Sequence, residues 1–332
     1  MIAIFLLAFG SPDSIESIEP FITNVMGGRK PSPNQLQKIK ERYLIIGGRS
    51  PLLDITKKQA EALEKRLNSK IPLNPPLLKG EKSSPKGDFG VFVGMRYWHP
   101  FIKDILNEIK NSGAERIVAL VMAPHYSKVS TGGYIKAVNE AMTELNANIG
   151  VSFINNWHVH PLFLKAVAEK IKKGFSYFKD VNKKEIQVIF SAHSLPKIPP
   201  SPPFDKGGKG GLEDAPYVKQ LNETIEGIIR YTGDITRHLG FQSKGMSPGE
   251  WLEPTVDSIL ERLSKEGKKY VLIVPVGFVS DNIETLYDID IVYQKMAESL
   301  GMIFHRTESL NDSPKFIESM VSIIREHLQL LM

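Results

Sequence analysis

The sequence predicts an α/β protein made of two similar doubly wound parallel-sheet halves, Rossmann-like, that face a central cleft. Short apolar runs alternate with segments of helical spacing along the chain, which is typical of parallel βαβ units. This alternation occurs as two successive series of strands and helices. With 332 residues, the chain is long enough to form both halves.

The first series begins with the apolar run 2–8, which is typical of a strand buried on both faces. A polar helix start follows at 13–19, after a break at Gly10-Ser-Pro12. The further expected elements are helices at 34–46, 52–67 and 101–111, strands at 89–94, 116–122 and 148–154, and a helix that opens at 130–134.

The second series repeats the pattern after residue 160. Its expected elements are helices at 161–177, 215–231, 283–299 and 313–330, and strands at 186–190, 235–242, 270–276 and 302–305. We therefore expect an N-terminal half (1–160), a C-terminal half (161–312) and a C-terminal helix (313–332) that packs back on the halves.

Two stretches rich in proline, glycine and lysine do not fit this pattern, 72–88 and 199–213. Both contain Pro-Pro followed two residues later by Lys-Gly-x-Lys, and neither shows hydrophobic periodicity. We interpret them as related surface insertions without a catalytic role, or as a docking surface.

Composition excludes several classes of protein. The chain has no cysteine, which rules out disulfides, thiolate zinc sites and a cysteine-held iron–sulfur cluster. The net charge of +5 is mild, and no arginine-rich tract suggests nucleic acid. No apolar run is long enough to span a membrane, and the chain enters a strand at once, so we expect a cytoplasmic protein with at most peripheral membrane contact.

Polar and aromatic residues follow several of the expected strands. In an open α/β sheet, ligands bind at the carboxyl ends of the strands. The residues found there are Phe9-Gly-Ser-Pro12, Arg96-Tyr-Trp-His99, His125-Tyr-Ser127, His193 and Ser280-Asp-Asn-Ile-Glu284.

Among these residues, His193 and Glu284 are the pair best suited to proton transfer or metal binding. Asp288 is four residues beyond Glu284, so both carboxylates share one face of a helix near its N-terminus. A histidine and a carboxylate suit proton transfer, or an open site that a divalent ion enters and leaves, because structural metal sites are usually closed by four ligands. The alternative is structural: His193 ends a strand, and the two acids cap a helix.

Common competing motifs are absent. The chain has no Gly-x-Gly-x-x-Gly after a strand, no phosphate-binding loop and no Gly-x-Ser-x-Gly nucleophile elbow. Nucleotide binding and serine hydrolysis are therefore not indicated.

Several motifs carry a resemblance to a known family. They are Phe9-Gly-Ser-Pro12, Arg42-Tyr43, Ile46-Gly-Gly-Arg-Ser-Pro-Leu52, Ala123-Pro-His-Tyr-Ser127, Ser191-Ala-His-Ser-Leu-Pro196, Trp251-Leu-Glu-Pro254 and Pro275-Val-Gly-Phe-Val-Ser-Asp-Asn-Ile-Glu-Thr-Leu-Tyr-Asp288. Together they make the chain resemble the ferrochelatases, lyases that insert Fe²⁺ into a porphyrin during haem biosynthesis. The resemblance covers nearly the whole chain apart from the two insertions.

The resemblance implies a chelatase-like fold and a set of site residues. His193 and Glu284 would be catalytic and, with Asp288, would meet the metal. The porphyrin contacts would be Phe9, Arg42, Tyr43, Ser50, Tyr134, Trp251 and Phe278, most of them in the N-terminal half. Fe²⁺ is then a substrate, no cofactor is permanently bound, and we expect a monomer. A cleft that favours a bent macrocycle would expose the pyrrole nitrogens to His193 while two protons are released.

Three residues depart from the family pattern. Phe9 stands where relatives that act on coproporphyrin have a tyrosine facing the iron. Val292 stands where some relatives have a further acid one turn after Asp288, and Glu253 stands where glycine is usual. Whether protoporphyrin IX or coproporphyrin III is the natural substrate stays open.

Two other functions compete with iron insertion. One is a cobalt or nickel chelatase that acts on a related tetrapyrrole, although pairing His193 with a glutamate rather than a second histidine favours iron. The other is a two-lobed solute-binding protein, which would not need an acid–base pair.

Overall fold

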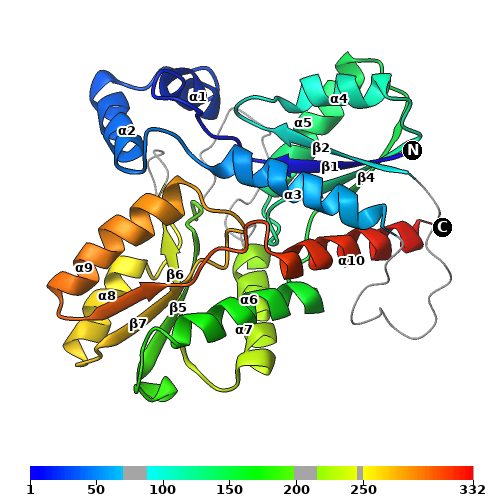
Figure 1. Ribbon diagram of the computed structural model, residues 1–332. Coiled ribbons are helices and arrows are strands. Elements are labelled where there is room, and N and C mark those ends of the chain that lie inside the picture. Colours follow the sequence, from blue (N-terminus) through cyan, green and yellow to red (C-terminus); the bar gives the residue numbers. More distant parts are fainter. Residues whose placement is uncertain (70–87, 198–214, 245–249, 332) are drawn as a thin grey trace. The chain divides into compact units, whose positions relative to one another are not determined.

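The computed structural model describes residues 1–69, 88–197, 215–244 and 250–331 (Figure 1). The chain forms two compact units. Unit 1 comprises Met1–Pro124, Ser130–Phe163 and Asn311–Met332, and unit 2 comprises His125–Val129 and Leu164–Leu310. The C-terminal segment belongs to unit 1.

Unit 1 is built on a four-stranded parallel sheet. The strand order is β2 (Phe89–Met95), β1 (Ile2–Ala8), β3 (Arg116–Val121) and β4 (Gly150–Ile154). β1 is central, and its residues from Ala3 to Leu7 are completely buried, as its continuous apolar sequence predicts.

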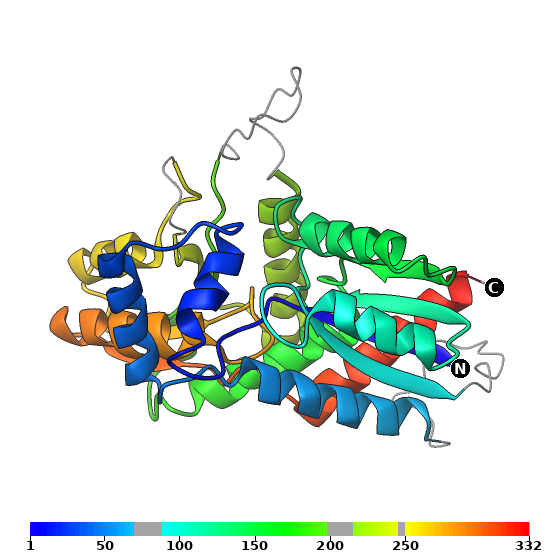
Figure 2. The ribbon, with the colours of Figure 1, turned by 90° about the horizontal axis from the view of Figure 1, so that it is seen from above.

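Helices cover both faces of this sheet. The helices of unit 1 are α1 (Ile18–Val25), α2 (Pro33–Ile45), α3 (Leu52–Leu67), α4 (Ile102–Asn111), α5 (Thr131–Glu144) and α10 (Pro314–Leu330), of which α1 and α2 contact each other. α4 and α5 bury Leu106, Ile109 and Val138 against alternate residues of β1 and β3. α3 and α10 pack against each other on the other face (Figures 1 and 2).

Unit 2 repeats this topology. Its parallel sheet has the order β6 (Thr236–Gln242), β5 (Ile186–His193), β7 (Tyr270–Val274) and β8 (Ile303–Arg306). In each sheet the first strand lies between the second and the third, so the two halves are similar, as the sequence predicts.

The helices of unit 2 also lie on both faces of its sheet. α6 (Pro161–Phe175), whose first residues belong to unit 1, and α7 (Ala215–Thr232) pack together, since Gly227 of α7 lies against Leu164 of α6. On the other face, α8 (Val256–Lys265), a π-helix η2 (Glu284–Tyr293) and α9 (Gln294–Ser299) bury Ile259 and Ile289 against β5 and β7. A 3-10 turn, η1 (Lys183–Glu185), precedes β5.

The structure corrects or refines several of the expected elements. α8 was not expected from the sequence, although Thr255 caps it and four apolar residues at helical spacing fill its buried face. The first helix begins at Ile18, within the start expected at 13–19, and the side chains of Ser14 and Ser17 hydrogen-bond the backbone just before it. β5 extends three residues beyond its apolar run and ends on His193 itself.

The helix expected over 283–299 is present, and it begins as the π-helix η2 and continues as α9. Gln242 donates its side-chain amide to the Glu284 carbonyl over 3.2 Å. An α-helix would use that carbonyl for its own ladder, and a side chain inserted there favours a wider turn.

The two predicted insertions, 72–88 and 199–213, lie outside the described residues except for Asp88. Across the part of the chain that the structure describes, no helix combines the length and the apolar character needed to cross a membrane.

Candidate active site

His193 is held at the end of β5 in one defined tautomer. Its Nδ1 lies 2.6 Å from the backbone oxygen of Ser194. A carbonyl oxygen only accepts hydrogen bonds, so Nδ1 carries the proton and donates it. In the neutral ring, Nε2 is then the nitrogen with the lone pair. His193 can therefore accept a proton at Nε2 without turning its ring.

The backbone around His193 is fixed from two sides. Tyr217 of α7 donates its hydroxyl to the His193 carbonyl over 3.2 Å. Ser194 donates its backbone N–H to the Gln242 carbonyl of β6 over 2.7 Å, and its hydroxyl donates to the Leu252 carbonyl. These bonds restrict the position of the imidazole by pinning the chain on both sides of it.

Trp251 lies beside the His193 motif. Pro196 and Trp251 form an antiparallel bridge, and Leu252 donates its backbone N–H to the Leu195 carbonyl over 3.0 Å. The Trp251 side chain is partly exposed. Trp251 therefore pairs with Pro196, three residues after His193, although the two segments are about sixty residues apart in sequence.

Glu284 and Asp288 belong to the π-helix that packs beside the end of β6. Gln242, the strand partner of His193, donates to the Glu284 carbonyl, and Ser243 donates its hydroxyl to Oδ2 of Asp288 over 2.5 Å. Both acids are partly exposed. The end of β6 therefore links His193 to the two acids expected near the metal.

The loop that carries Phe278 is seated against β5. Gly277 donates its N–H to the Ser191 carbonyl over 3.1 Å, and a Cβ at Gly277 would lie 2.9 Å from the Cα and the Cβ of Ala192. Only glycine permits this approach. Phe278 follows at once and is half-buried beside the strand end.

Unit 2 thus gathers five of the predicted site residues, namely His193, Trp251, Phe278, Glu284 and Asp288, around the carboxyl ends of β5, β6 and β7. Among the described residues, no three histidine or acidic side chains are arranged to hold a metal ion. This arrangement differs from a structural metal site closed by four ligands.

In unit 1, Phe9 and Tyr134 belong to one aromatic and cationic cluster. Phe9 directly follows β1 and is 42% exposed, and its ring lies 4.7 Å from that of Tyr97. The Arg96 guanidinium lies 4.7 Å from the centre of the Tyr97 ring and 5.6 Å from that of Tyr134. Burial raises the pKa of Tyr134, against the opposing charge of Arg96, so its hydroxyl stays protonated at neutral pH.

The remaining predicted contacts of unit 1 lie at the end of α2 and just beyond it. Tyr43 is buried, and Arg42 is half-buried. Ser50 is buried between the helices: its N–H donates to the Pro12 carbonyl, and its hydroxyl accepts from the N–H of Leu52. Ser50 is thereby tied to the segment that begins with Phe9.

Sequence reasoning missed the residues that hold the site in place. Gln242, Ser243 and Tyr217 lie on elements that the sequence predicted, but no motif marked their side chains. His125 was noted only as a strand end. Its Nε2 lies 2.9 Å from the Thr224 hydroxyl, and its ring meets that of Tyr217 edge-on. A polar face with spacing 217, 220 and 224 on α7 was the available signal, because these positions share one side of a helix.

The three departures from the family pattern are all accommodated at exposed positions. Phe9 and Val292 are 42% and 39% exposed. Glu253 is exposed and lies 3.9 Å from Lys197. Packing in the core therefore does not determine which side chain stands at these three positions.

Comparison with known proteins shows similarity over nearly the whole chain. The family model described as Ferrochelatase matches residues 1–328. The chain is 37% identical to a ferrochelatase of Geotalea uraniireducens over 341 aligned positions, covering 98% of this chain and 97% of the relative. It is 35% identical to a coproporphyrin III ferrochelatase of Oceanobacillus iheyensis, covering 97% and 96%.

Solved structures share the fold at low sequence identity. SirB of Bacillus subtilis, solved with Fe³⁺, gives a TM-score of 0.54 at 10% identity and covers 98% of this chain and 94% of that one. The sirohydrochlorin chelatase SirB of Bacillus subtilis subspecies spizizenii, in complex with cobalt, gives 0.51 at 13% identity, covering 99% and 95%. These likenesses concern the fold alone.

Proposed function

The chain belongs to the ferrochelatase family, and from this premise we propose that His193 and Glu284 carry the insertion reaction. Membership of the family makes the protein an enzyme, a lyase that inserts iron into a porphyrin in haem biosynthesis. A passive solute-binding protein is excluded. Of the two chelatase functions, insertion of iron is favoured over insertion of cobalt or nickel, because the similarity along the full length is to ferrochelatases.

His193 is the proposed proton acceptor. Metal insertion converts Fe²⁺ and a porphyrin with two pyrrole N–H groups into the iron porphyrin and two protons. The observation that carries this proposal is the Nδ1–H bond to the Ser194 carbonyl, because it leaves Nε2 as the basic nitrogen. The same bond stabilises the imidazolium that forms when Nε2 takes a pyrrole proton.

Glu284 and Asp288 are proposed to meet the incoming Fe²⁺. Carboxylate oxygens bind divalent ions, and two of them on one helix face give the ion successive partners. The Ser243 hydroxyl on Asp288 orients that carboxylate. Because the described residues form no closed ligand set around them, the ion would be released to the porphyrin rather than retained.

The porphyrin contacts are proposed separately for each unit. In unit 1 they are Phe9, Arg42, Tyr43, Ser50 and Tyr134. Arg42 would pair with a propionate, and the Ser50 hydroxyl would bond to one. In unit 2, Trp251 and Phe278 would pack against the macrocycle.

The decisive experiment is the variant His193→Ala. We expect it to abolish iron insertion, followed anaerobically by the absorbance of the product, while porphyrin binding survives as measured by fluorescence titration. His305→Ala serves as a control for the loss of an imidazole, because the His305 ring stacks on the exposed Tyr177. Near-normal turnover of His193→Ala would remove the assignment.

A comparison of kcat/KM for coproporphyrin III and protoporphyrin IX would identify the natural porphyrin. Relatives named ferrochelatase and coproporphyrin III ferrochelatase are 37% and 35% identical to the chain. Coproporphyrin III carries more propionates than protoporphyrin IX, so a preference for it would direct further work to the cationic partners Arg42 and Arg96.

We also propose that the protein works in the cytoplasm, as a monomer and without a resident cofactor. The lack of cysteine supports the absence of a thiolate-held iron–sulfur cluster. Cell fractionation, analytical ultracentrifugation and metal analysis of the purified protein test these three points in turn.

A further inference from the structure

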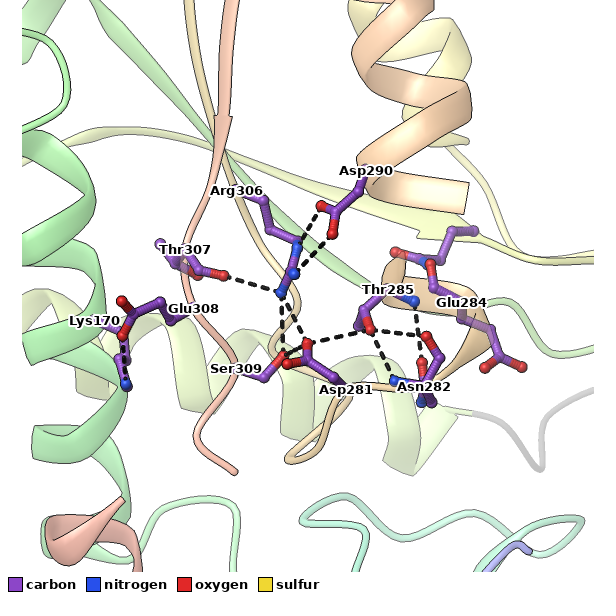
Figure 3. A network of polar contacts seen from close by, with 11 residues as sticks. Lys170, Asp281, Asn282, Glu284, Thr285, Asp290, Arg306, Thr307, Glu308 and Ser309 are labelled. Carbon is purple, nitrogen blue, oxygen red and sulfur yellow. Dashed lines mark hydrogen bonds and ion pairs between the residues drawn. The ribbon is translucent and has the colours of Figure 1, made fainter. Parts of the chain in front are cut away.

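Arg306 lies at the centre of a polar network next to the π-helix that carries the proposed metal ligands (Figure 3). It is the last residue of β8, and its side chain is only 14% exposed. Nε and Nη2 donate to the two carboxylate oxygens of Asp290 over 2.6 and 2.8 Å. Nη1 donates to Oδ1 of Asp281 over 3.1 Å.

The two carboxylates that Arg306 holds flank the proposed metal ligands in sequence. Asp281 lies three residues before Glu284, in the loop that leads into the π-helix. Asp290 lies two residues beyond Asp288, inside the π-helix. Figure 3 shows Asp281 and Asp290 turned toward Arg306, whereas the side chain of Glu284 points away from it. One guanidinium therefore holds both ends of the stretch 281–290.

Further bonds make this network rigid. Ser309 donates its hydroxyl to Oδ1 of Asp281 over 2.6 Å and accepts from Arg306. Asn282 and Thr285 exchange two bonds between backbone N–H groups and side-chain oxygens, of 2.9 and 3.0 Å. These contacts connect the loop, the first turn of the π-helix and the end of β8.

The chemistry of the network requires arginine. A guanidinium offers five donors in a planar fork, so it can bind Asp290 through two bonds and Asp281 through a third. A lysine ammonium cannot reproduce that geometry. Burial disfavours the charge of Arg306, but its bonds to Asp290 and the charges of both aspartates outweigh this effect and raise its pKa.

We propose that Arg306 is a positioning residue for metal delivery: by holding Asp281 and Asp290, it fixes Glu284 and Asp288 in the orientation that receives Fe²⁺. This inference rests on the proposed role of Glu284. Residues that orient metal ligands from outside commonly affect metal affinity by about 10- to 100-fold. The network should thus set the affinity for iron and leave that for porphyrin unchanged.

The test uses Asp290→Asn, which keeps the shape of the side chain and weakens the fork, together with Arg306→Lys, which keeps the charge. For each folded variant, the KM for Fe²⁺, the Kd for porphyrin and the binding of Co²⁺ alone are measured. We expect KM for Fe²⁺ and Kd for Co²⁺ to rise about tenfold in both variants while porphyrin binding stays within about twofold.

The matched control is Glu308→Gln. Glu308 lies two residues from Arg306 and pairs with Lys170 over 2.8 Å and with Lys173, but it has no bond to the π-helix. Its substitution should leave KM for Fe²⁺ unchanged. A combined variant, Asp290→Asn with Glu284→Gln, should raise KM for Fe²⁺ no further than Glu284→Gln alone, because coupled residues are not additive.

The outcomes separate the two proposals. If Glu284→Gln raises KM for Fe²⁺ but Asp290→Asn does not, the positioning role is wrong and the role of Glu284 stands. Equal losses in iron and porphyrin binding would show a merely structural network and would also overturn the inference. If Glu284→Gln itself leaves KM for Fe²⁺ unchanged, the proposed role of Glu284 fails, and the inference fails with it.

Discussion

At the scale of single residues, Gly277 shows how packing fixes the geometry beside His193. A Cβ at this position would lie 2.9 Å from both the Cα and the Cβ of Ala192, and real Cβ contacts are longer than that. Part of this contact is backbone, so no flexible side chain can yield. The loop that carries Phe278 would have to move away from β5.

We therefore predict that Gly277→Ala destabilises the protein by about 1–3 kcal/mol, the usual cost of overpacking, and lowers iron insertion as well. Denaturant unfolding and initial rates measure the two effects. Gly150→Ala is the matched control, because nothing lies within 4 Å of a Cβ there and the residue begins a strand. Equal stability of the two variants would contradict the packing argument.

The sequence could single out His193 and Glu284 as candidate site residues but could not predict the contacts that support them. Both lie at ends of elements that hydrophobic patterns reveal, and the strand-end rule then selects them. The tautomer of His193 depends on the carbonyl of Ser194. The position of that carbonyl is set in turn by the backbone contact between Ser194 and β6. Such long-range contacts leave no periodic trace in sequence.

At the scale of elements, β6 and α8 are joined through a histidine that must stay neutral. His238 donates from Nε2 to Oε1 of Gln187 over 3.1 Å, while Nδ1 accepts from Arg262 over 3.2 Å. Burial lowers the pKa of His238, and the charge of Arg262 lowers it further. Protonation would turn Nδ1 into a donor that faces the guanidinium.

The lowered pKa of His238 makes the stability of the fold depend on pH. The unfolded chain has a histidine pKa near about 6.5 and binds the proton more readily than the folded protein does. The contribution of His238 to stability is thus complete above about pH 6.5 and declines as the pH falls below it. We predict that thermal stability declines less steeply from pH 7 to 5.5 in His238→Gln than in the parent protein. Parallel declines would refute this assignment.

The π-helix marks the limit of element prediction. Residues 283–299 have helical spacing, which correctly indicates a helix, but the spacing does not distinguish an α-helix from a π-helix. The π-helix is accompanied by a long-range contact that the spacing does not encode, the donation from the Gln242 amide to the Glu284 carbonyl. α8 does carry a signal in the sequence, because Thr255 caps it and apolar residues follow at helical spacing.

At the scale of the whole molecule, the alternation of strands and helices was enough to predict two similar parallel sheets. The chain order did not reveal that the C-terminal segment returns to unit 1. Phe316 of α10 lies with its ring 6.0 Å from that of Trp157, and Arg66 of α3 pairs with Glu318 over 2.5 Å. An apolar helix face shows that a helix packs on something, but not on which unit.

This return makes the last helix a stability element for the first strands, and two leucines on it provide the test. Leu328 is 3% exposed and Leu330 is 85% exposed, on the same helix two residues apart. We predict that Leu328→Ala costs about 2–4 kcal/mol, because it leaves a cavity in a packed face, whereas Leu330→Ala changes stability by less than about 0.5 kcal/mol. Hydrogen exchange should show the loss of protection in peptides of β1 and α3 and not in peptides of β7, because α10 belongs to unit 1. Loss of protection confined to β7 would mean that α10 stabilises unit 2 instead.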